Sequence, residues 1–245
     1  MNRETKEALD GHGLIIYQKK DGFRFGIDAV LLAHFASFKD RGTILDLGSG
    51  TGVIPLLLQR DYKEARFMAL EIQPSLVEMM RRSVIENGLE EKIEVLEANM
   101  VATGLASSSI DGITCNPPYY PLTQKLQSPN EMKAISRHEL HMNFESLCRE
   151  VSRILKPQGS FFLIHRPHRL VEILETLREF RLEPKVLRLV HPRREKPANL
   201  VLIKAVRSAG AELSIEPPLY VYEGQGYSRE LLELYDELAI ERTRS

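Results

Sequence analysis

The chain has 245 residues, of which 43% are hydrophobic and 27% charged, so it can build the core of a globular protein. Its formal net charge of −1 excludes an overall field that attracts nucleic acid, so any polyanion site must come from a local cluster of charge. Residues 1–10 lack a secretory apolar stretch, no apolar run approaches the roughly 20 residues that span a bilayer, and Cys115 and Cys148 form no CxxC pair. These features predict a cytoplasmic protein without a membrane partner, a disulfide or a thiolate metal site.

The first 40 residues are expected to form a hairpin and a helix. Residues 14–18 and 23–25 flank the dipeptide Asp21-Gly22, which favours a tight hairpin turn. Apolar residues then recur with helical spacing up to Phe35, and Asp28 lies near the start of this segment.

From residue 43 onward, short apolar runs alternate with amphipathic segments. Strands are expected at 43–47, 66–72, 92–96, 110–115, 159–164, 185–190 and 198–206. Helices are expected at about 53–60, 74–87, 143–155, 168–180 and 228–240. Alternating strands and helices indicate βαβ units, hence an α/β fold with a largely parallel sheet.

A glycine-rich turn, Asp46-Leu47-Gly48-Ser49-Gly50-Thr51-Gly52, follows the first of these strands. Glycines let a backbone turn sharply and approach a ligand, and open α/β sheets bind ligands at this end of a strand. The spacing is GxGxG, whereas a dinucleotide fingerprint reads GxGxxG. The negative charge of the Asp46 carboxylate would repel a diphosphate, whereas it would attract a ligand with an amino group. We therefore expect S-adenosylmethionine, which carries an amine and a sulfonium but no phosphate, at Asp46, Gly48, Gly50 and Gly52.

Two polar residues at the next strand ends fit the same ligand. Glu71 ends the second strand, 19 residues beyond Gly52, where an acid can accept hydrogen bonds from ribose hydroxyls. Asn99 follows the third strand and is a candidate contact for the adenine ring. A plain surface acid and a polar loop residue are the alternatives for these two positions.

These motifs resemble the class I methyltransferase pattern, since DLGSGTG matches its cofactor glycine motif and ALEIQ contains its ribose-binding acid. The resemblance covers about residues 40–206. It implies a Rossmann-like seven-stranded sheet, mostly parallel with the last strand antiparallel, and helices on both faces. We expect residues 1–40 to cap the cofactor site, 41–207 to form the methyltransferase core, and 208–245 to form an extension packed on that core.

The motif Asn116-Pro117-Pro118-Tyr119 directly follows the fourth strand. An exocyclic amine on a nucleobase is a poor nucleophile because its lone pair is delocalised into the ring. The Asn116 side-chain oxygen and the Pro117 carbonyl can accept its protons, and paired prolines hold both acceptors in place. Tyr119 offers a flat face on which the base can stack. The alternative is a Pro-Pro dipeptide that merely ends a strand.

The NPPY motif resembles that of methyltransferases acting on adenine amines, guanine N2 amines and glutamine amides, so it indicates a planar amine as the acceptor. The segments FRFGIDAVLLA, CNPPY, SRHE and HPRREKPANLVLIKA together resemble bacterial methyltransferases that modify adenine at nucleotide 37 of a valine tRNA. In that resemblance Phe25, Gly26 and Asp28 cap the cofactor, although Asp28 also fits a simple helix-start charge. The helical domain of release-factor glutamine methyltransferases and the target-recognition insertion of DNA adenine methyltransferases have no counterpart in these 245 residues.

RNA binding is expected at local basic clusters. Residues 185–207 contain seven basic residues and one acid, Glu195, and the loop at 191–197 carries Arg193, Arg194 and Lys196. Such a loop would bind phosphate with a strong salt dependence, and a solvated loop without a partner is the alternative. Lys125 and Arg137 are further RNA candidates in the long 120–143 connection. The histidines of the sequence RHELH, at 137–141, lack HExxH spacing, so we expect no metal.

The leading hypothesis is an S-adenosylmethionine-dependent methyltransferase acting on adenine N6 in tRNA, at nucleotide 37 of a valine tRNA. One rival methylates another planar amine, in ribosomal RNA (adenine or guanine N2) or in a protein glutamine. A second rival is a non-catalytic RNA-binding protein on the same scaffold. The oligomeric state stays open, with a monomer favoured, and residues 224–227 receive no function beyond a turn.

Overall fold

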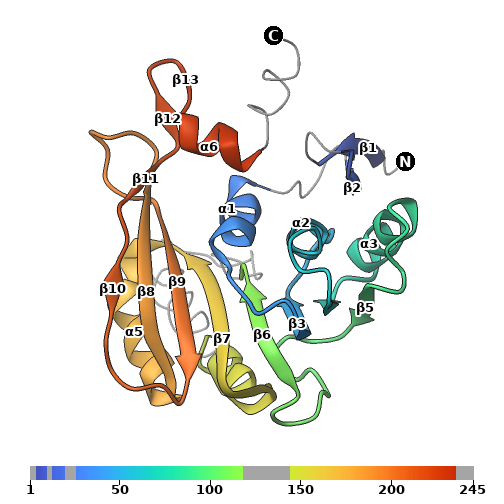
Figure 1. Ribbon diagram of the computed structural model, residues 1–245, viewed down its shortest axis with the longest axis horizontal. Helices are drawn as coiled ribbons and strands as arrows, with labels where there is room; N and C mark the ends of the chain where they lie inside the picture. The colour runs from blue at the N-terminus through green and yellow to red at the C-terminus, as the bar shows by residue number, and fades with distance from the viewer. Residues whose placement is uncertain (1–3, 10–12, 20–25, 118–143, 236–245) are drawn as a thin grey trace, which may run out of the picture.

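A nine-stranded sheet forms the centre of the molecule in the computed structural model, which describes residues 4–9, 13–19, 26–117 and 144–235 (Figure 1). Its strands are β3 (Gly42–Leu47), β4 (Ala65–Glu71), β5 (Ile93–Glu97), β6 (Ile110–Cys115), β7 (Leu155–His165), β8 (Leu182–His191), β9 (Leu200–Arg207), β10 (Ser214–Ile215) and β11 (Leu219–Tyr220). The order is β10-β8-β9-β7-β6-β3-β4-β5, and β11 also pairs with β8. The seven long strands match those expected from the sequence, whereas β10 and β11 were not anticipated.

Strand direction decides which strand ends meet. Neighbouring strands from β5 to β7 run parallel, and β9 is antiparallel to both β7 and β8. The expected mostly parallel sheet with an antiparallel last strand is therefore confirmed. Because β9 reverses direction between them, β8 runs the same way as β7 and β6. The loop that follows β8 consequently lies at the same edge of the sheet as the loops that follow β3 and β6.

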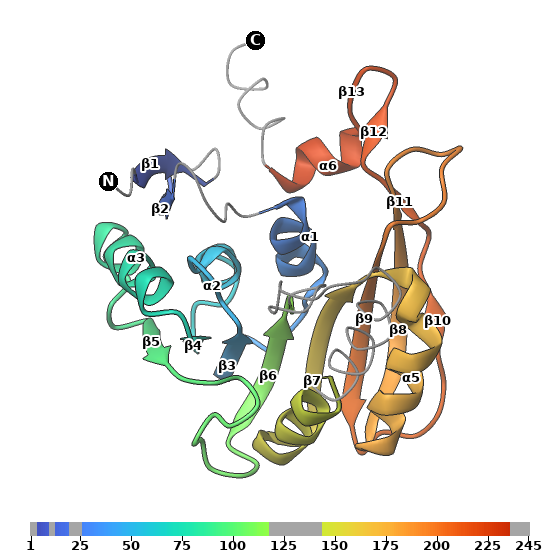
Figure 2. The ribbon, with the colours of Figure 1, turned by 180° about the vertical axis from the view of Figure 1, so that it is seen from behind.

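Helices cover both faces of the sheet. They are α1 (Ile27–Phe35), α2 (Val53–Leu58), α3 (Pro74–Glu86), the helical residues 144–154, the short η1 (Pro167–Arg169) and α5 (Leu170–Glu179). Because alternate side chains of a strand point to opposite faces, Phe162 packs in one apolar cluster with α1 and α2, and Phe161 packs in another with residues 144–154 and α5. Figure 2 shows α5 in front of the sheet, on the face opposite to that seen in Figure 1.

The N-terminal hairpin contains a strand that the sequence did not predict. The strand expected at 14–18 is present as β2 (Ile15–Lys19) and pairs antiparallel with β1 (Glu4–Ala8), whereas residues 23–25, the expected partner, lie outside the described residues. β1 was missed because its sequence, ETKEA, is largely charged and has little strand propensity. The hairpin docks on α3, where Asn87 donates to the Ile15 carbonyl at 2.7 Å.

A second small hairpin and a helix follow the sheet. β12 (Tyr222–Glu223) pairs with β13 (Gly226–Tyr227), and Gly224 has a φ of 60° at the first of the two turn residues, where a type II′ turn requires glycine. The expected C-terminal helix begins after Ser228, whose hydroxyl accepts from the Leu231 amide, and is present as α6 (Arg229–Leu234). Among the described helices, none combines the length and the apolar character needed to cross a bilayer.

Candidate active site

The glycine-rich turn, Glu71 and Asn116 lie side by side at one edge of the sheet. Leu47, the last residue of β3, pairs with Leu70 of β4 on one side and with Cys115 of β6 on the other. The next residue of each strand therefore emerges at the same edge, which is where parallel α/β sheets bind ligands. Asp28 lies in the first turn of α1, and its contact with the cofactor stays a prediction.

Glycine is required in the turn by both backbone conformation and space. Gly48, Gly50 and Gly52 have φ values of 72°, 58° and 91°, a region that residues with a Cβ rarely adopt. The amides of residues 48 and 49 both donate to the Leu70 carbonyl at 2.9 Å, so β4 holds the turn in place. A Cβ at Gly52 would lie 2.9 Å from the Cγ of Met80 on α3. The turn thus packs tightly on its neighbours and presents its backbone at the edge.

Replacing Gly52 by alanine is expected to lower the free energy of unfolding by roughly 2–4 kcal/mol, because it adds left-handed backbone strain to a clash with Met80. Gly104→Ala is the matched control, since Gly104 has a similar φ of 74° but nothing within 4 Å of an added Cβ. Urea unfolding of both variants separates the backbone strain, which both share, from the clash with Met80, which only Gly52→Ala has. Equal losses of unfolding free energy in the two variants would contradict the tight packing of the turn.

Asp46 is a buried carboxylate with one free oxygen. It is 2% exposed, and its Oδ1 accepts a hydrogen bond from Thr114 Oγ1 on β6 at 2.7 Å. Its Oδ2 has no hydrogen-bond partner among the described residues, and neither do the buried hydroxyls of Ser49 and Thr51. Burial raises the pKa of Asp46 to about 6, against the opposing effects of the nearby Ser49 hydroxyl and of the bond from Thr114, and the nearby Glu71 carboxylate raises it further. These unpaired buried groups fit a ligand with a cationic amine, as S-adenosylmethionine has.

Glu71 ties the second strand to the glycine turn. Its Oε2 accepts from the Gly50 amide at 3.0 Å, and its Oε1 accepts from the amides of Ile72 and Gln73 at 3.0 and 2.9 Å. A carboxylate has about four acceptor positions, so capacity remains for a ribose hydroxyl. The Glu71 side chain is fixed in orientation by the backbone before any ligand binds.

Sequence reasoning missed two apolar residues at this edge. Ile72 is 56% exposed directly after Glu71, and Met100 Sδ lies 3.6 Å from where a Cβ of Gly48 would be. Both offer apolar surface to a flat ring beside the turn. Asn99, the expected adenine contact, is exposed, and its Oδ1 accepts from the Val101 amide at 3.1 Å within its own turn. Its contact with adenine stays a prediction.

The NPPY motif, which the sequence predicts to be catalytic, begins where β6 ends. Asn116 is half-buried and Pro117 is buried, while Pro118 and Tyr119 lie outside the described residues. Thr114, two residues earlier, is the residue that bonds Asp46, so one strand links the motif to the cofactor turn. Burial raises the pKa of the preceding Cys115 thiol well above its usual range, which leaves it a neutral core residue.

His165 is a further residue at this edge that the sequence did not single out. Cys115 pairs with Leu163 of β7, so two residues on His165 lies beside Pro117. Burial lowers the pKa of His165 to about 4, assisted by Arg169, so the ring is neutral at pH 7. Its Nδ1 accepts from the Arg166 amide at 2.7 Å, which places the ring proton on Nε2. The sequence could have indicated this residue, because His165 is the last residue of β7, the strand next to the one that leads into the NPPY motif.

The expected RNA contacts are only partly near this site. Arg193, Arg194 and Lys196 lie in the loop between β8 and β9, at the same edge as Asn116 but separated from β6 by β7 and β9. Other basic residues of the 185–207 cluster lie at the opposite ends of the strands, such as Lys185, which bonds the Gly210 carbonyl. Phe25, Lys125, Arg137 and the histidines at 138 and 141 are outside the described residues.

Comparison with known proteins places this arrangement in a family. The model of the methyltransferase small domain family matches residues 26–181. A relative from Bacteroides thetaiotaomicron, named tRNA1(Val) (adenine(37)-N6)-methyltransferase, is 30% identical over 150 residues, which cover 61% of this chain and 62% of that protein. A relative of the same name from Dyadobacter fermentans is 27% identical over 215 residues, covering 85% and 88%. The match to the Bacteroides protein therefore spans about three fifths of its length.

The fold comparison agrees. A crystal structure described as a predicted O-methyltransferase, protein Atu636 from Agrobacterium tumefaciens, superposes with a TM-score of 0.69 at 25% identity. The superposition covers 85% of this chain and 95% of that one. Because the family model matches well over half of the 245 residues, from α1 through α5, the chain belongs to the methyltransferase small domain family.

Proposed function

We propose that this chain uses S-adenosylmethionine to methylate the exocyclic N6 of adenine in tRNA, at nucleotide 37 of a valine tRNA. The observation that carries the proposal is the strand register that sets Asn116 beside the glycine turn, with Thr114 bonded to Asp46. The relatives named for this reaction support the substrate. In this proposal residues 1–40 cap the cofactor, 41–207 form the core and 208–245 extend it.

Each cofactor contact has a physical reason. The free Oδ2 of Asp46 takes the amino group, and Glu71 takes a ribose hydroxyl with its remaining acceptor position. The glycine turn brings its backbone close to the ligand, and Asn99, Asp28 and Phe25 complete the contacts. When bound, S-adenosylmethionine supplies an electrophilic methyl group on its sulfonium.

The acceptor amine is activated by orientation rather than by a strong base. The Asn116 side-chain oxygen and the Pro117 carbonyl accept hydrogen bonds from the two amine N–H groups, which favours the pyramidal form whose lone pair can attack. Tyr119 stacks on the base and fixes its plane. Neither buried neighbour acts as a base, because the Cys115 thiol stays protonated and the neutral His165 already accepts a hydrogen bond at Nδ1. As the N–C bond would form, the S–C bond would break to leave a neutral thioether, and the positive charge would pass to the protonated amine product, which is acidic and loses its proton to solvent.

The RNA backbone is held by basic residues outside the site. Arg194 and Lys196 are exposed in the β8–β9 loop, and Arg193 is half-buried beside them. Lys125 and Arg137 belong to the connection after the catalytic motif. Phosphate contacts of this kind make affinity fall steeply with salt, so RNA binding is expected to weaken strongly between 50 and 200 mM salt.

Methyl transfer from radiolabelled S-adenosylmethionine into unmodified valine tRNA tests the proposal. We expect N6-methyladenosine in the product nucleosides and no label in a valine tRNA whose adenine 37 is replaced by guanine. Label in ribosomal RNA or protein instead would keep the chemistry and overturn the substrate. Tight cofactor binding without transfer to any of these would favour the non-catalytic RNA-binding alternative.

A further inference from the structure

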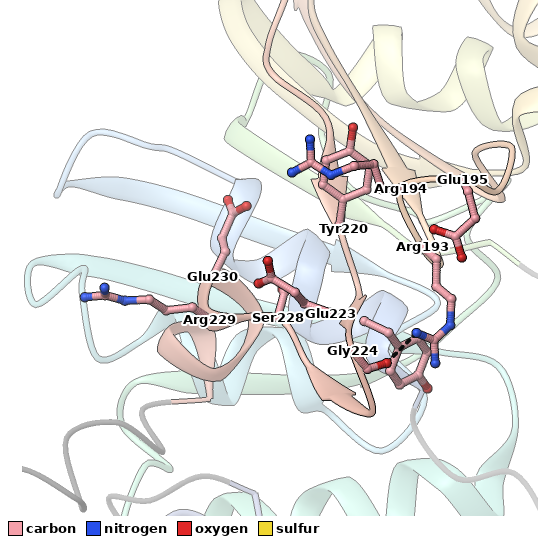
Figure 3. Close-up of a pocket in the computed structure, with 10 residues that line it drawn as sticks. Arg193, Arg194, Glu195, Tyr220, Glu223, Gly224, Ser228, Arg229 and Glu230 are labelled. Atoms are coloured by element: carbon pink, nitrogen blue, oxygen red, sulfur yellow. Dashed lines mark hydrogen bonds between the residues drawn. The ribbon is translucent and has the colours of Figure 1, made fainter.

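A pocket of about 260 Å³ lies between the β8–β9 loop and the β12–β13 hairpin (Figure 3). Pockets that enclose a whole small molecule usually measure about 300–1,000 Å³, so this one suits a single flat group of a longer ligand. Its lining comes from two segments, residues 193–195 and 220–230. Because β8 runs parallel to β6, the pocket opens at the same edge of the sheet as Asn116.

The hairpin presents a pair of stacked, exposed aromatic rings. Tyr222 and Tyr227 pair across the two strands, and their ring centroids are 5.3 Å apart at an interplanar angle of 20°. They remain 39% and 46% exposed, so both residues keep part of their surface open to solvent. Neither ring belongs to the apolar clusters of the core that the structure describes, so core packing does not explain why this hairpin carries two tyrosines.

The hairpin is fixed in position by the basic loop. Arg193 donates to the Gly224 carbonyl at 2.6 Å, the bond drawn in Figure 3, and its guanidinium lies 5.4 Å over the Tyr222 ring. The amide of Tyr222 donates to the Pro192 carbonyl at 2.9 Å. The aromatic pair is therefore held in place before a ligand arrives, which lowers the entropy lost on binding.

The charges around the pocket nearly cancel. The lining contains Arg193, Arg194 and Arg229 together with three carboxylates. Arg229 forms an ion pair with Glu233, and the lining residue Glu230 forms one with Arg188, both partners being outside the lining. A balanced set of charges does not concentrate polyphosphate. It suits a neutral flat group with polar edges, such as a nucleobase, whose amino groups a carboxylate can bond. Arg194, which lies 5.0 Å over Tyr220 and is exposed, can meet the phosphate of the same nucleotide.

We propose that the Tyr222–Tyr227 pair stacks on one unpaired base of the RNA substrate. Three strand spacings of about 4.8 Å, roughly 15 Å in all, separate β8 from β6, and the hairpin that carries the pair lies beyond the end of β8. The pair is therefore farther from Asn116 than about four stacked nucleotides at 3.4 Å each. The stacked base is consequently not a neighbour of the methylated adenine in the RNA chain. This inference rests on the RNA substrate of the proposed function.

A single tryptophan provides a direct readout of stacking. The chain contains no tryptophan, so Tyr227→Trp gives one fluorophore at the pair and keeps an aromatic surface. We expect a short single-stranded RNA to quench its emission saturably, and a duplex of the same sequence to have no such effect. Ile85→Trp is the control, because Ile85 is 60% exposed on α3, which packs on β4 and β5 at the other end of the sheet. Its emission should stay unchanged.

Tyr227→Ala tests the same contact through kinetics. Loss of one base stack is expected to raise KM for valine tRNA about tenfold, while kcat and cofactor affinity are unchanged. If RNA does not quench the emission of Tyr227→Trp, or quenches Tyr227→Trp and Ile85→Trp equally, the stacking site is refuted. A protein partner would then be the remaining candidate for the pocket. If the wild type methylates the tRNA and Tyr227→Ala has the same KM for it as the wild type, the stacking site is also refuted, while the proposed function is supported. RNA quenching without any methyl transfer by the wild type would overturn the proposed function alone.

Discussion

Replacing Asn116 by alanine is expected to lower kcat for methyl transfer by about 100- to 1,000-fold, the range seen when one preorganised polar group is removed from a site of developing charge. The reason is that the target amine loses the acceptor that favours its pyramidal form, while the backbone carbonyl of Pro117 remains. Cofactor affinity should stay at its wild-type value, because the cofactor contacts come from other strands. Single-turnover methyl transfer and calorimetric cofactor binding measure the two quantities.

Asn116→Asp is the matched variant for this prediction. It keeps an acceptor oxygen at nearly the same position, so it should retain far more activity than Asn116→Ala. Equal kcat values for the wild type and the alanine variant would show that Asn116 does not orient the amine. A parallel loss in thermal stability would instead point to a structural role at the end of β6, which urea unfolding can detect.

Asp46→Asn is expected to stabilise the cofactor-free protein at pH 8. The pKa of Asp46 is raised from 3.8 to about 6 by burial, so the folded state holds the proton more tightly than the unfolded chain. The resulting stability is fully present below about pH 4 and is lost as the pH rises through 6. A raised pKa of this size corresponds to about 3 kcal/mol at 1.36 kcal/mol per pH unit. The free energy of unfolding of the variant, relative to the wild type, should therefore increase by up to about 3 kcal/mol between pH 4 and pH 8.

The same substitution is expected to weaken cofactor binding. The cofactor amine needs the ionised carboxylate, so wild-type affinity should rise as the pH increases through 6, whereas Asp46→Asn should bind weakly and without that dependence. Urea unfolding without cofactor and calorimetry with it, both across this pH range, follow the two effects. An asparagine variant that binds as tightly as the wild type at pH 8 would refute the role of Asp46 with the amine.

The chemistry of neighbouring residues was sufficient to predict many of the strands and helices and the glycine turn. The strands at 43–47 and 110–115 and the helix start at Pro74 could be predicted because apolar runs and proline placement act within a few residues. The three glycines of the turn were predictable for the same reason, since their positive φ angles are required by the turn itself. The family resemblance then supplied the mostly parallel sheet with its antiparallel last strand, which periodicity cannot give.

Contacts between distant segments were decided only by the tertiary structure. Sequence periodicity does not say that β1 pairs with β2, because a largely charged strand forms only where a partner supplies its hydrogen bonds. The antiparallel β9 separates the basic residues of 185–207 between two edges of the sheet, although they are close in sequence. The same topology sets His165 beside Pro117 and joins Arg193 to Gly224, 31 residues later. The sequence by itself determined the glycine turn and the type of the seven long strands and of the main helices, because these depend on neighbouring residues. Strand order and side-chain burial depend on the whole chain, and only the tertiary structure decided them.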